Sequence, residues 1–302
     1  MFNKLETSKF ILLIILLLIC SSDIRAQYQV RFGIYTIHSV EKDSLIAQYL
    51  RDVIIETQQY LSDFFELELA KGVTIYLPRS DEQYSELSEK HVPDWSGAVA
   101  MINARKIILR PGNYFNPPEY RETLLHELVH IYTAQKVGAE AIPLWLNEGL
   151  AMNLSGKSIS WNESITIANT IASGYFISLN QIDSLLNFGY LKANVAYLEA
   201  FLAVQYLIDN YGLECLKDIL KDLNEGESID DTFRKNTSLD LLDFEFEFYQ
   251  MVKKKYQWMV LLQFENLMWV GLIVLVFMGF IIMKIRNRRV MKKWQDNGEI
   301  LM

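Results

Sequence analysis

The chain has 302 residues, of which 51% are hydrophobic, so it has enough material for one sizeable core or two small ones. Between Gln27 and Asn266 there are 20 lysine and arginine residues against 33 aspartate and glutamate residues, a net charge of −13. A surface of that sign repels phosphates, so the composition argues against nucleic acid as a partner.

The N-terminus has the pattern of a secretory signal peptide. Two lysines precede an apolar run, Phe10 to Ile19, which is too short to span a bilayer. Ala26 then suits a signal-peptidase cut. Cys20 offers the alternative of a lipoprotein anchor, although the isoleucine before it stands where a small residue is wanted. We therefore predict that residues 1–26 are a cleaved export signal.

The next part of the chain reads as strands around one helix. Tyr28 to His38 has strand composition, and Ser44 to Phe65 has apolar residues at helical spacing. Gly72 to Pro78 is a second short strand. A hairpin follows, with strands at Ala98 to Ile102 and Lys106 to Leu109.

After Pro118 the sequence predicts helices almost throughout. The expected helices are Glu119–Lys136, Leu146–Leu154, Glu163–Ser173, Ala193–Tyr211, Leu213–Leu223 and Leu239–Lys255. Strands first and helices afterwards predict an α+β fold rather than alternating α/β. No repeat or proline-rich linker interrupts the chain between the export signal and Tyr256, so we expect one domain over residues 27–256.

The C-terminal part predicts a membrane anchor. Leu267 to Met283 has 17 residues without a charge, just long enough to cross a bilayer as one helix. Six lysine and arginine residues follow, so the positive-inside rule places the tail, residues 284–302, in the cytoplasm. Lys253 to Lys255 weaken that rule, but the export signal indicates the same orientation. A buried core helix is the alternative, although few residues remain to bury it. The domain is thus expected outside the cell membrane, periplasmic or extracellular.

The stretch ETLLHELVHIYTAQ, Glu122 to Gln135, contains two of the four histidines of the chain. On a helix His126 and His130 lie one turn apart and can share one metal ion. Glu127 stands between them, where it can take a proton from a water at the metal. The plain alternative is a helix that contains two histidines with other partners. The motif favours a zinc site.

A catalytic zinc takes three protein ligands and a water, so a third ligand is needed. The other histidines, His38 and His91, precede the motif, and none follows it, so a downstream ligand must be a carboxylate. Glu148 is the best candidate, 18 positions after the motif on the first turn of another helix, where Gly149 lets backbones approach closely. Glu140 is the rival, in a connection where an exposed charge is the ordinary explanation.

HELVH followed by WLNEGLA resembles the gluzincin group of zinc peptidases, specifically the peptidase-MA-like domains of bacterial exported proteins. The resemblance covers about Gly72 to Tyr256 and is specific at the two motifs. It implies that His126, His130 and Glu148 bind Zn²⁺ and that Glu127 is the general base.

The resemblance also implies a minimal thermolysin-like fold, in which an edge strand lies across the cleft. SGAVAMI occupies that place in this sequence. Gly97, Ala98, Val99 and Ala100 are therefore expected to bind an extended polypeptide substrate by strand addition. An ordinary core hairpin is a compatible reading.

A later helix contains Tyr197 where related enzymes often place a tyrosine that stabilises the oxyanion. The alternative is an aromatic packing stripe with Phe201 and Leu202. Glu199, on the same helix, is expected to be solvated.

The sequence departs from the family pattern in two places. It lacks the GxMEN strand of related aminopeptidases, which argues against exopeptidase activity. Met152 stands where thermolysin-like enzymes orient a zinc histidine with an aspartate, and Asn153 is the nearby substitute. We predict a membrane-anchored extracytoplasmic zinc endopeptidase. The alternatives are an inactive, membrane-tethered binding or assembly protein and a zinc hydrolase of another amide, such as a cell-wall crosslink.

Overall fold

The computed structural model describes residues 27–89, 96–111, 116–185, 188–262 and 264–298. The chain forms two compact units, one of residues up to 157 with 179–241, the other of residues 158–178 with 242 onward. The predicted export signal and His91 lie outside the described residues. Strands come first and helices follow, so the predicted α+β fold is confirmed.

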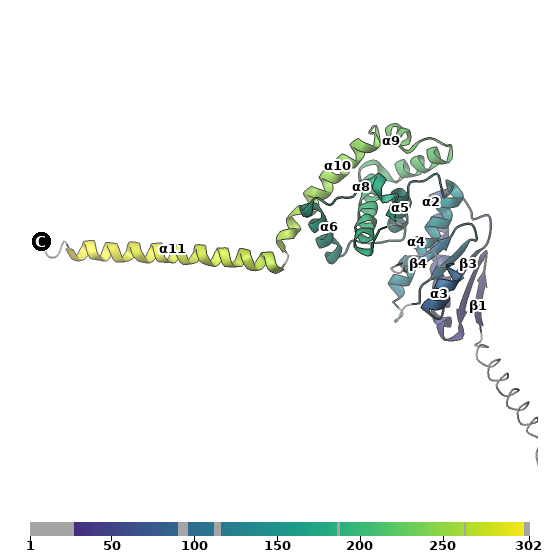
Figure 1. Cartoon of the computed structure of the whole chain (residues 1–302), viewed down its shortest axis with the longest axis horizontal. Coiled ribbons are helices and arrows are strands. Elements are labelled where there is room, and N and C mark those ends of the chain that lie inside the picture. The colour runs from purple at the N-terminus through teal and green to yellow at the C-terminus, as the bar shows by residue number, and fades with distance from the viewer. Residues whose placement is uncertain (1–26, 90–95, 112–115, 186–187, 263, 299–302) are drawn as a thin grey trace, which may run out of the picture. The chain divides into compact units, whose positions relative to one another are not determined.

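The first unit opens with a mixed, five-stranded sheet (Figure 1). Its strands are β1 (Gln27–Phe32), β2 (Tyr35–Val40), β3 (Val73–Tyr76), β4 (Ala98–Met101) and β5 (Lys106–Leu109). They lie in the order β1-β2-β3-β5-β4, with the central three parallel and the two edge strands antiparallel to their neighbours. The predicted hairpin is therefore present, and its first strand is an edge of the sheet.

The stretch expected as one strand, Tyr28 to His38, is instead the hairpin of β1 and β2. Phe32 pairs with Tyr35, which leaves a turn of two residues. Gly33 has a φ of 49° at the first turn position, a conformation that glycine adopts without strain. The prediction was wrong because the alternation of apolar side chains continues on both sides of this glycine.

Two helices connect the strands. α2 (Ser44–Phe65) has the predicted bounds and joins β2 to β3, with Leu50, Ile54 and Leu61 buried at helical spacing. α3 (Asp81–Leu87) was not predicted from the sequence. The Ser80 side chain caps it by accepting a hydrogen bond from the Gln83 backbone N–H.

In the rest of the first unit, the predicted helices begin earlier than expected, and two further helices were not predicted. They are α4 (Pro117–Lys136), α5 (Leu144–Leu154), α7 (Leu179–Ile182), α8 (Tyr190–Asn224) and α9 (Ile229–Thr237). α8 contains both helices expected between Ala193 and Leu223, with a kink at Gly212 (φ 87°, ψ 164°). α7 and α9 are short, and their apolar periodicity is too brief to be read from sequence.

α5 and α8 cross at Gly149 with no space for a side chain. A Cβ at this position would lie 2.3 Å from the Ala200 carbonyl oxygen and 2.6 Å from Val204 Cγ2. The close backbone approach expected at Gly149 is thus confirmed. Asn153 joins the same two helices, because its Nδ2 donates to the carbonyls of Gly149 (2.7 Å) and Phe201 (3.0 Å).

The second unit consists of α6 (Trp161–Ser173), α10 (Leu241–Tyr256), the 3-10 helix η3 (Gln257–Leu262) and α11 (Phe264–Gly298). Inside this unit, Phe176 packs its ring against Phe248 and Tyr249. Among the described residues one segment is long and apolar enough to cross a membrane, Leu267–Lys292, with a mean hydropathy of 2.4 in its most apolar window. None of that window is buried, which is contrary to the alternative of a core helix.

Candidate metal centre

α4 carries both motif histidines. Pro117 and Pro118 occupy its first positions, where a fixed φ suits the helix and the missing N–H costs nothing. The helix is held in place by its buried apolar side chains. These are Leu124, Leu125, Leu128, Val129, Ile131 and Tyr132. His126 and His130, one turn apart, therefore project together from another side of the helix.

Three donor atoms from α4 and α5 converge on one point. His126 Nε2 lies 3.1 Å from His130 Nε2, and Glu148 Oε2 lies 3.2 Å and 3.6 Å from these two nitrogens, respectively. Three atoms held about 2.1 Å from one zinc ion at tetrahedral angles stand about 3.4 Å apart. The measured triangle therefore fits three protein ligands of a single zinc ion. Glu140, the rival ligand, is exposed and is no part of this group.

The electrostatics of the triangle favour a positive charge at its centre. Glu148 is 8% exposed, and no hydrogen bond from the described residues reaches its Oε2 atom. Burial opposes ionisation of Glu148, yet the adjacent His130 and His126 rings hold the pKa of its carboxyl well below the usual range. Burial likewise disfavours the charged form of His130, but Glu148 raises the pKa of that ring to about 9. The three donor atoms lie close enough together to hold one metal ion between them.

Glu127 is a second buried carboxyl beside the triangle, 7% exposed. Burial raises its pKa above the ordinary value, and the neighbouring His126 and His130 rings offset part of that effect. Its carboxylate accepts a hydrogen bond from the Ala100 backbone N–H, which brings it against the edge strand β4. A buried carboxyl with a raised pKa suits both acceptance and return of a proton near neutral pH.

β4 presents free backbone groups beside Glu127. The Arg110 N–H donates to the Gly97 carbonyl at 2.8 Å, so Gly97 and Val99 form the hydrogen-bonded pairs with β5. The N–H and C=O groups of Ala98 and Ala100 therefore face the open edge of the sheet. Of these groups, the Ala98 carbonyl accepts from Ser96 Oγ at 2.5 Å and the Ala100 N–H donates to Glu127.

Tyr197 on α8 lies in the electrostatic range of both carboxylates. Burial raises its pKa, and the charges of Glu148 and Glu127 add to the effect. Its phenol is consequently protonated at neutral pH. Glu199, expected to be solvated, is buried at 3% exposure, so that prediction was wrong. Every residue of α8 from Leu198 to Val204 is buried. A helix that is covered on all sides has no polar face that its sequence pattern could reveal.

Asn147, which sequence reasoning missed, contacts a motif histidine directly. Its Oδ1 lies 3.1 Å from His130 Nδ1, so the ring donates from Nδ1 and directs the Nε2 lone pair toward the triangle. Asn153, the predicted substitute for an orienting aspartate, donates its amide to two backbone carbonyls instead. The only sign in the sequence was that Asn147 directly precedes Glu148. Whether its side chain reaches His130 depends on how α5 crosses α4.

Comparison with known proteins agrees with the geometry. A family model described as the Peptidase MA superfamily matches residues 58–254, which is more than half of the chain. No curated protein matches the chain in a sequence search. The matched range contains α4, α5, α8 and the edge strand β4, and with them His126, His130 and Glu148. The chain belongs to the Peptidase MA superfamily.

Proposed function

We propose that the chain is a membrane-anchored zinc metallopeptidase of the gluzincin, thermolysin-like type, which cleaves polypeptides outside the cytoplasm as an endopeptidase. The observation that carries the proposal is the triangle of His126, His130 and Glu148 donor atoms beside the buried Glu127 carboxyl. Membership of the Peptidase MA superfamily supports a peptidase-like hydrolase.

In this proposal His126 and His130 hold Zn²⁺ through Nε2, and Glu148 holds it through a carboxylate oxygen. The spacing of the donors and the buried Glu148 Oε2 without a hydrogen bond both fit such an ion. Bound zinc would supply a Lewis acid that polarises the scissile carbonyl and lowers the pKa of a water. Asn147 keeps His130 in the tautomer that presents its Nε2 lone pair.

Glu127 is the general base. Its carboxylate takes a proton from the attacking water and returns it to the leaving amine. Because burial raises its pKa, the protonated form needed for the second step is more accessible than in an exposed glutamate. The hydrogen bond from the Ala100 N–H orients the carboxylate against β4.

The open edge of β4 would bind the substrate backbone. The outward Ala98 N–H and Ala100 C=O groups can pair with an extended peptide, while Gly97 and Val99 remain paired with β5. The strand lies against Glu127, so a peptide added there brings its backbone to the base. Tyr197, protonated at neutral pH, is the proposed hydrogen-bond donor to the oxyanion.

The membrane part of the proposal rests on the candidate span in α11. We assign residues 1–26 to an export signal, 27–256 to the peptidase domain, 267–283 to the transmembrane helix and 284–302 to a basic cytoplasmic tail. In this arrangement the polypeptide substrates are periplasmic or extracellular.

The decisive experiment combines zinc content and turnover of the purified full chain in detergent. One zinc per chain and cleavage of casein or a peptide digest are expected. Glu127→Gln should keep the zinc and lose activity about 10²- to 10⁴-fold, the usual contribution of a general base. Glu122→Gln, the same charge change on the same helix, is the control and should retain activity. Stoichiometric zinc without turnover of any peptide would overturn the peptidase assignment in favour of a binding protein.

A further inference from the structure

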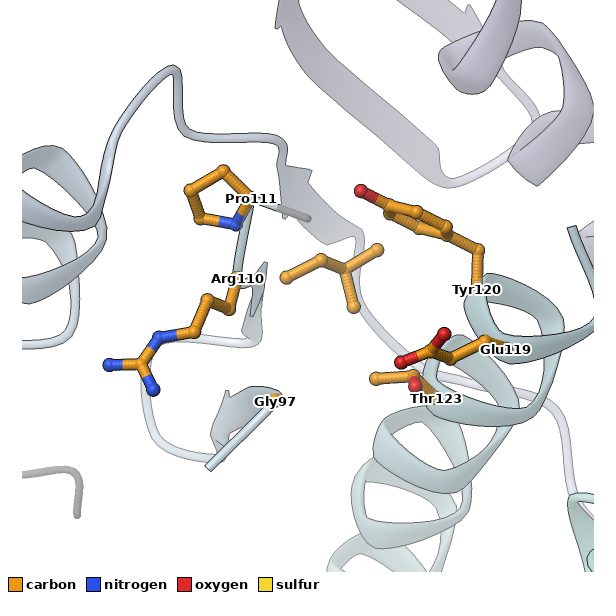
Figure 2. A pocket seen from close by; sticks show the side chains of 7 residues that line it. Gly97, Arg110, Pro111, Glu119, Tyr120 and Thr123 are labelled. Carbon is orange, nitrogen blue, oxygen red and sulfur yellow. The ribbon is translucent and has the colours of Figure 1, made fainter. Parts of the chain in front are cut away.

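A pocket of about 180 Å³ lies between the β4–β5 hairpin and the first turns of α4 (Figure 2). Its lining residues are Gly97, Leu109, Arg110, Pro111, Glu119, Tyr120 and Thr123. A single water needs only about 10–15 Å³ of such space, so the pocket accommodates a long side chain.

The pocket is one helical turn from the proposed base. Thr123 precedes Glu127 by four residues and so lies on the same side of α4. Gly97 precedes Ala100 by three residues, and the Ala100 N–H donates to Glu127. Residues of a strand are about 3.3 Å apart, so Gly97 lies about 10 Å along β4 from that contact. A peptide paired with β4 therefore carries a side chain to the pocket within about three residues of the cut.

The two charged residues of the pocket differ in what surrounds them. Arg110 Nε lies 3.1 Å from Asp81 Oδ1, and its guanidinium lies over the Tyr84 ring at 4.7 Å from the centroid. Figure 2 shows this guanidinium directed away from the α4 wall. The Arg110 guanidinium thus has a nearby counter-charge in Asp81 and points away from the α4 wall.

The opposite wall is acidic. Figure 2 shows the Glu119 carboxylate on the cavity side of α4, and the Tyr120 and Thr123 side chains also extend from this helix. Glu119 Oε2 accepts a hydrogen bond from Asn116 Nδ2, a neutral donor, at 3.2 Å. Figure 2 shows Pro111 on the opposite side of the pocket, and the apolar Leu109 also lines it. A cavity with an apolar wall and a carboxylate on the opposite side suits a side chain that has methylene groups and a positively charged end.

We propose that this pocket is a side-chain subsite for a lysine or arginine of the polypeptide substrate, and that Glu119 determines this specificity. Leu109 and Pro111 contact the methylene stem, and Glu119 pairs with the charged head group. The inference rests on the proposed peptidase function, because it takes the substrate to lie along β4.

The first test is the cleavage profile of the full chain in detergent on a peptide digest. Lysine and arginine should be enriched about fivefold at one position within three residues of the cut, the effect of one solvent-accessible ion pair. Glu119→Gln should remove that enrichment while cleavage of other peptides continues. Glu122→Gln, three residues further along α4 and outside the pocket, should retain the enrichment.

The second test measures binding without turnover. In the Glu127→Gln background, two fluorescent peptides are compared that carry lysine or norleucine at the position found in the profile. The lysine peptide should bind about fivefold more tightly, and Glu119→Gln should make the two affinities equal. Glu119→Lys should favour a glutamate peptide instead. Thermal unfolding of each variant shows whether it is folded, because Glu119 also lies in the first turn of α4.

The outcomes separate this proposal from the one on which it rests. A wild-type chain that binds no zinc and cleaves no peptide overturns the peptidase function. A chain that cleaves peptides with no basic preference, or with one that Glu119→Gln leaves unchanged, overturns the subsite alone.

Discussion

Asn147 decides which nitrogen of the neutral His130 ring carries the proton. A neutral imidazole has one N–H and one lone pair, and the hydrogen bond to Asn147 Oδ1 at 3.1 Å assigns the N–H to Nδ1. Without that contact the ring can adopt the other tautomer, whose Nε2–H points into the triangle.

Asn147→Ala should therefore weaken zinc binding about 10- to 100-fold, as loss of a hydrogen bond behind a ligand does. Competition with a chromogenic chelator measures the affinity. Asn153→Ala is the matched comparison. It should lower the free energy of unfolding by about 1–2 kcal/mol, because two backbone carbonyls lose a donor, while zinc affinity stays the same. Weaker zinc binding in Asn153→Ala but not in Asn147→Ala would mean that Asn153 orients the zinc histidine, as the sequence suggested.

Glu148→Ala should reduce bound zinc well below one ion per chain, because two histidines alone make an incomplete site. Metal analysis of the purified protein measures the loss. Glu140→Ala, at the rival position in an exposed connection, should leave zinc content unchanged. Zinc loss in Glu140→Ala rather than in Glu148→Ala would exchange the two assignments.

At the scale of elements, the crossing of α5 and α8 positions Glu148. Gly149 follows Glu148 directly, and a Cβ there would meet the Ala200 carbonyl oxygen at 2.3 Å. Because a backbone atom cannot move aside as a flexible side chain can, α5 must shift to admit a methyl group.

Gly149→Ala should lower the free energy of unfolding by about 1–3 kcal/mol and reduce zinc affinity at the same time. Urea unfolding and the chelator assay measure the two effects. Gly189→Ala is the control, since a Cβ at Gly189 meets nothing within 4 Å and its φ is negative. Equal stability of both variants would show that the crossing tolerates a side chain.

The end of α8 is joined to α9 through Asp222. Its carboxylate accepts from Lys235 Nζ at 2.6 Å and from Asn236 Nδ2 at 2.7 Å. Burial opposes ionisation of Asp222, but these two hydrogen bonds outweigh it and hold its pKa below the ordinary value. The resulting stabilisation is present above the unfolded-state pKa of about 3.9 and disappears as pH falls through the lower folded-state pKa.

Asp222→Asn should therefore destabilise the protein at pH 7 and much less at pH 3. Urea unfolding at the two pH values measures the difference. The exposed Asp218→Asn change, on the same helix, should have little effect at either pH. A loss of stability that is the same at both pH values would mean that charge pairing with Lys235 contributes nothing.

At the scale of the whole molecule, α11 contains an apolar segment with exposed side chains and a basic sequence at its end. In water such a helix exposes apolar area that a bilayer would cover. In the proposed topology the basic residues after it lie on the cytoplasmic side, as the positive-inside rule predicts.

The full chain should remain in the membrane fraction after alkaline carbonate extraction. Green fluorescent protein fused to the C-terminus should fluoresce, because the proposed topology places that end in the cytoplasm, and alkaline phosphatase fused there should be inactive. Phosphatase activity without fluorescence would place the tail outside and the proposed active site inside the cell.

The spacing of residues in the sequence was sufficient to predict several secondary-structure elements of this molecule. The bounds of α2 and the strands β4 and β5 follow from apolar periodicity and turn residues, which depend on neighbours in sequence. The adjacency of His126 and His130 follows from 3.6 residues per turn. The hairpin at Gly33 was missed because one glycine inside an alternating pattern is a weak local signal.

The sequence by itself determined the α+β order, the motif helix and a carboxylate candidate for the third ligand. Only the tertiary structure decided that Glu148 Oε2 lies within 3.6 Å of both histidines, that Asn147 contacts His130, and that Glu199 is buried. It also decided that Glu119 faces a pocket beside β4. The physical reason is that helix and strand periods are set by the backbone of consecutive residues. Distances between elements are set by packing, here by the close crossing of α5 and α8 at Gly149.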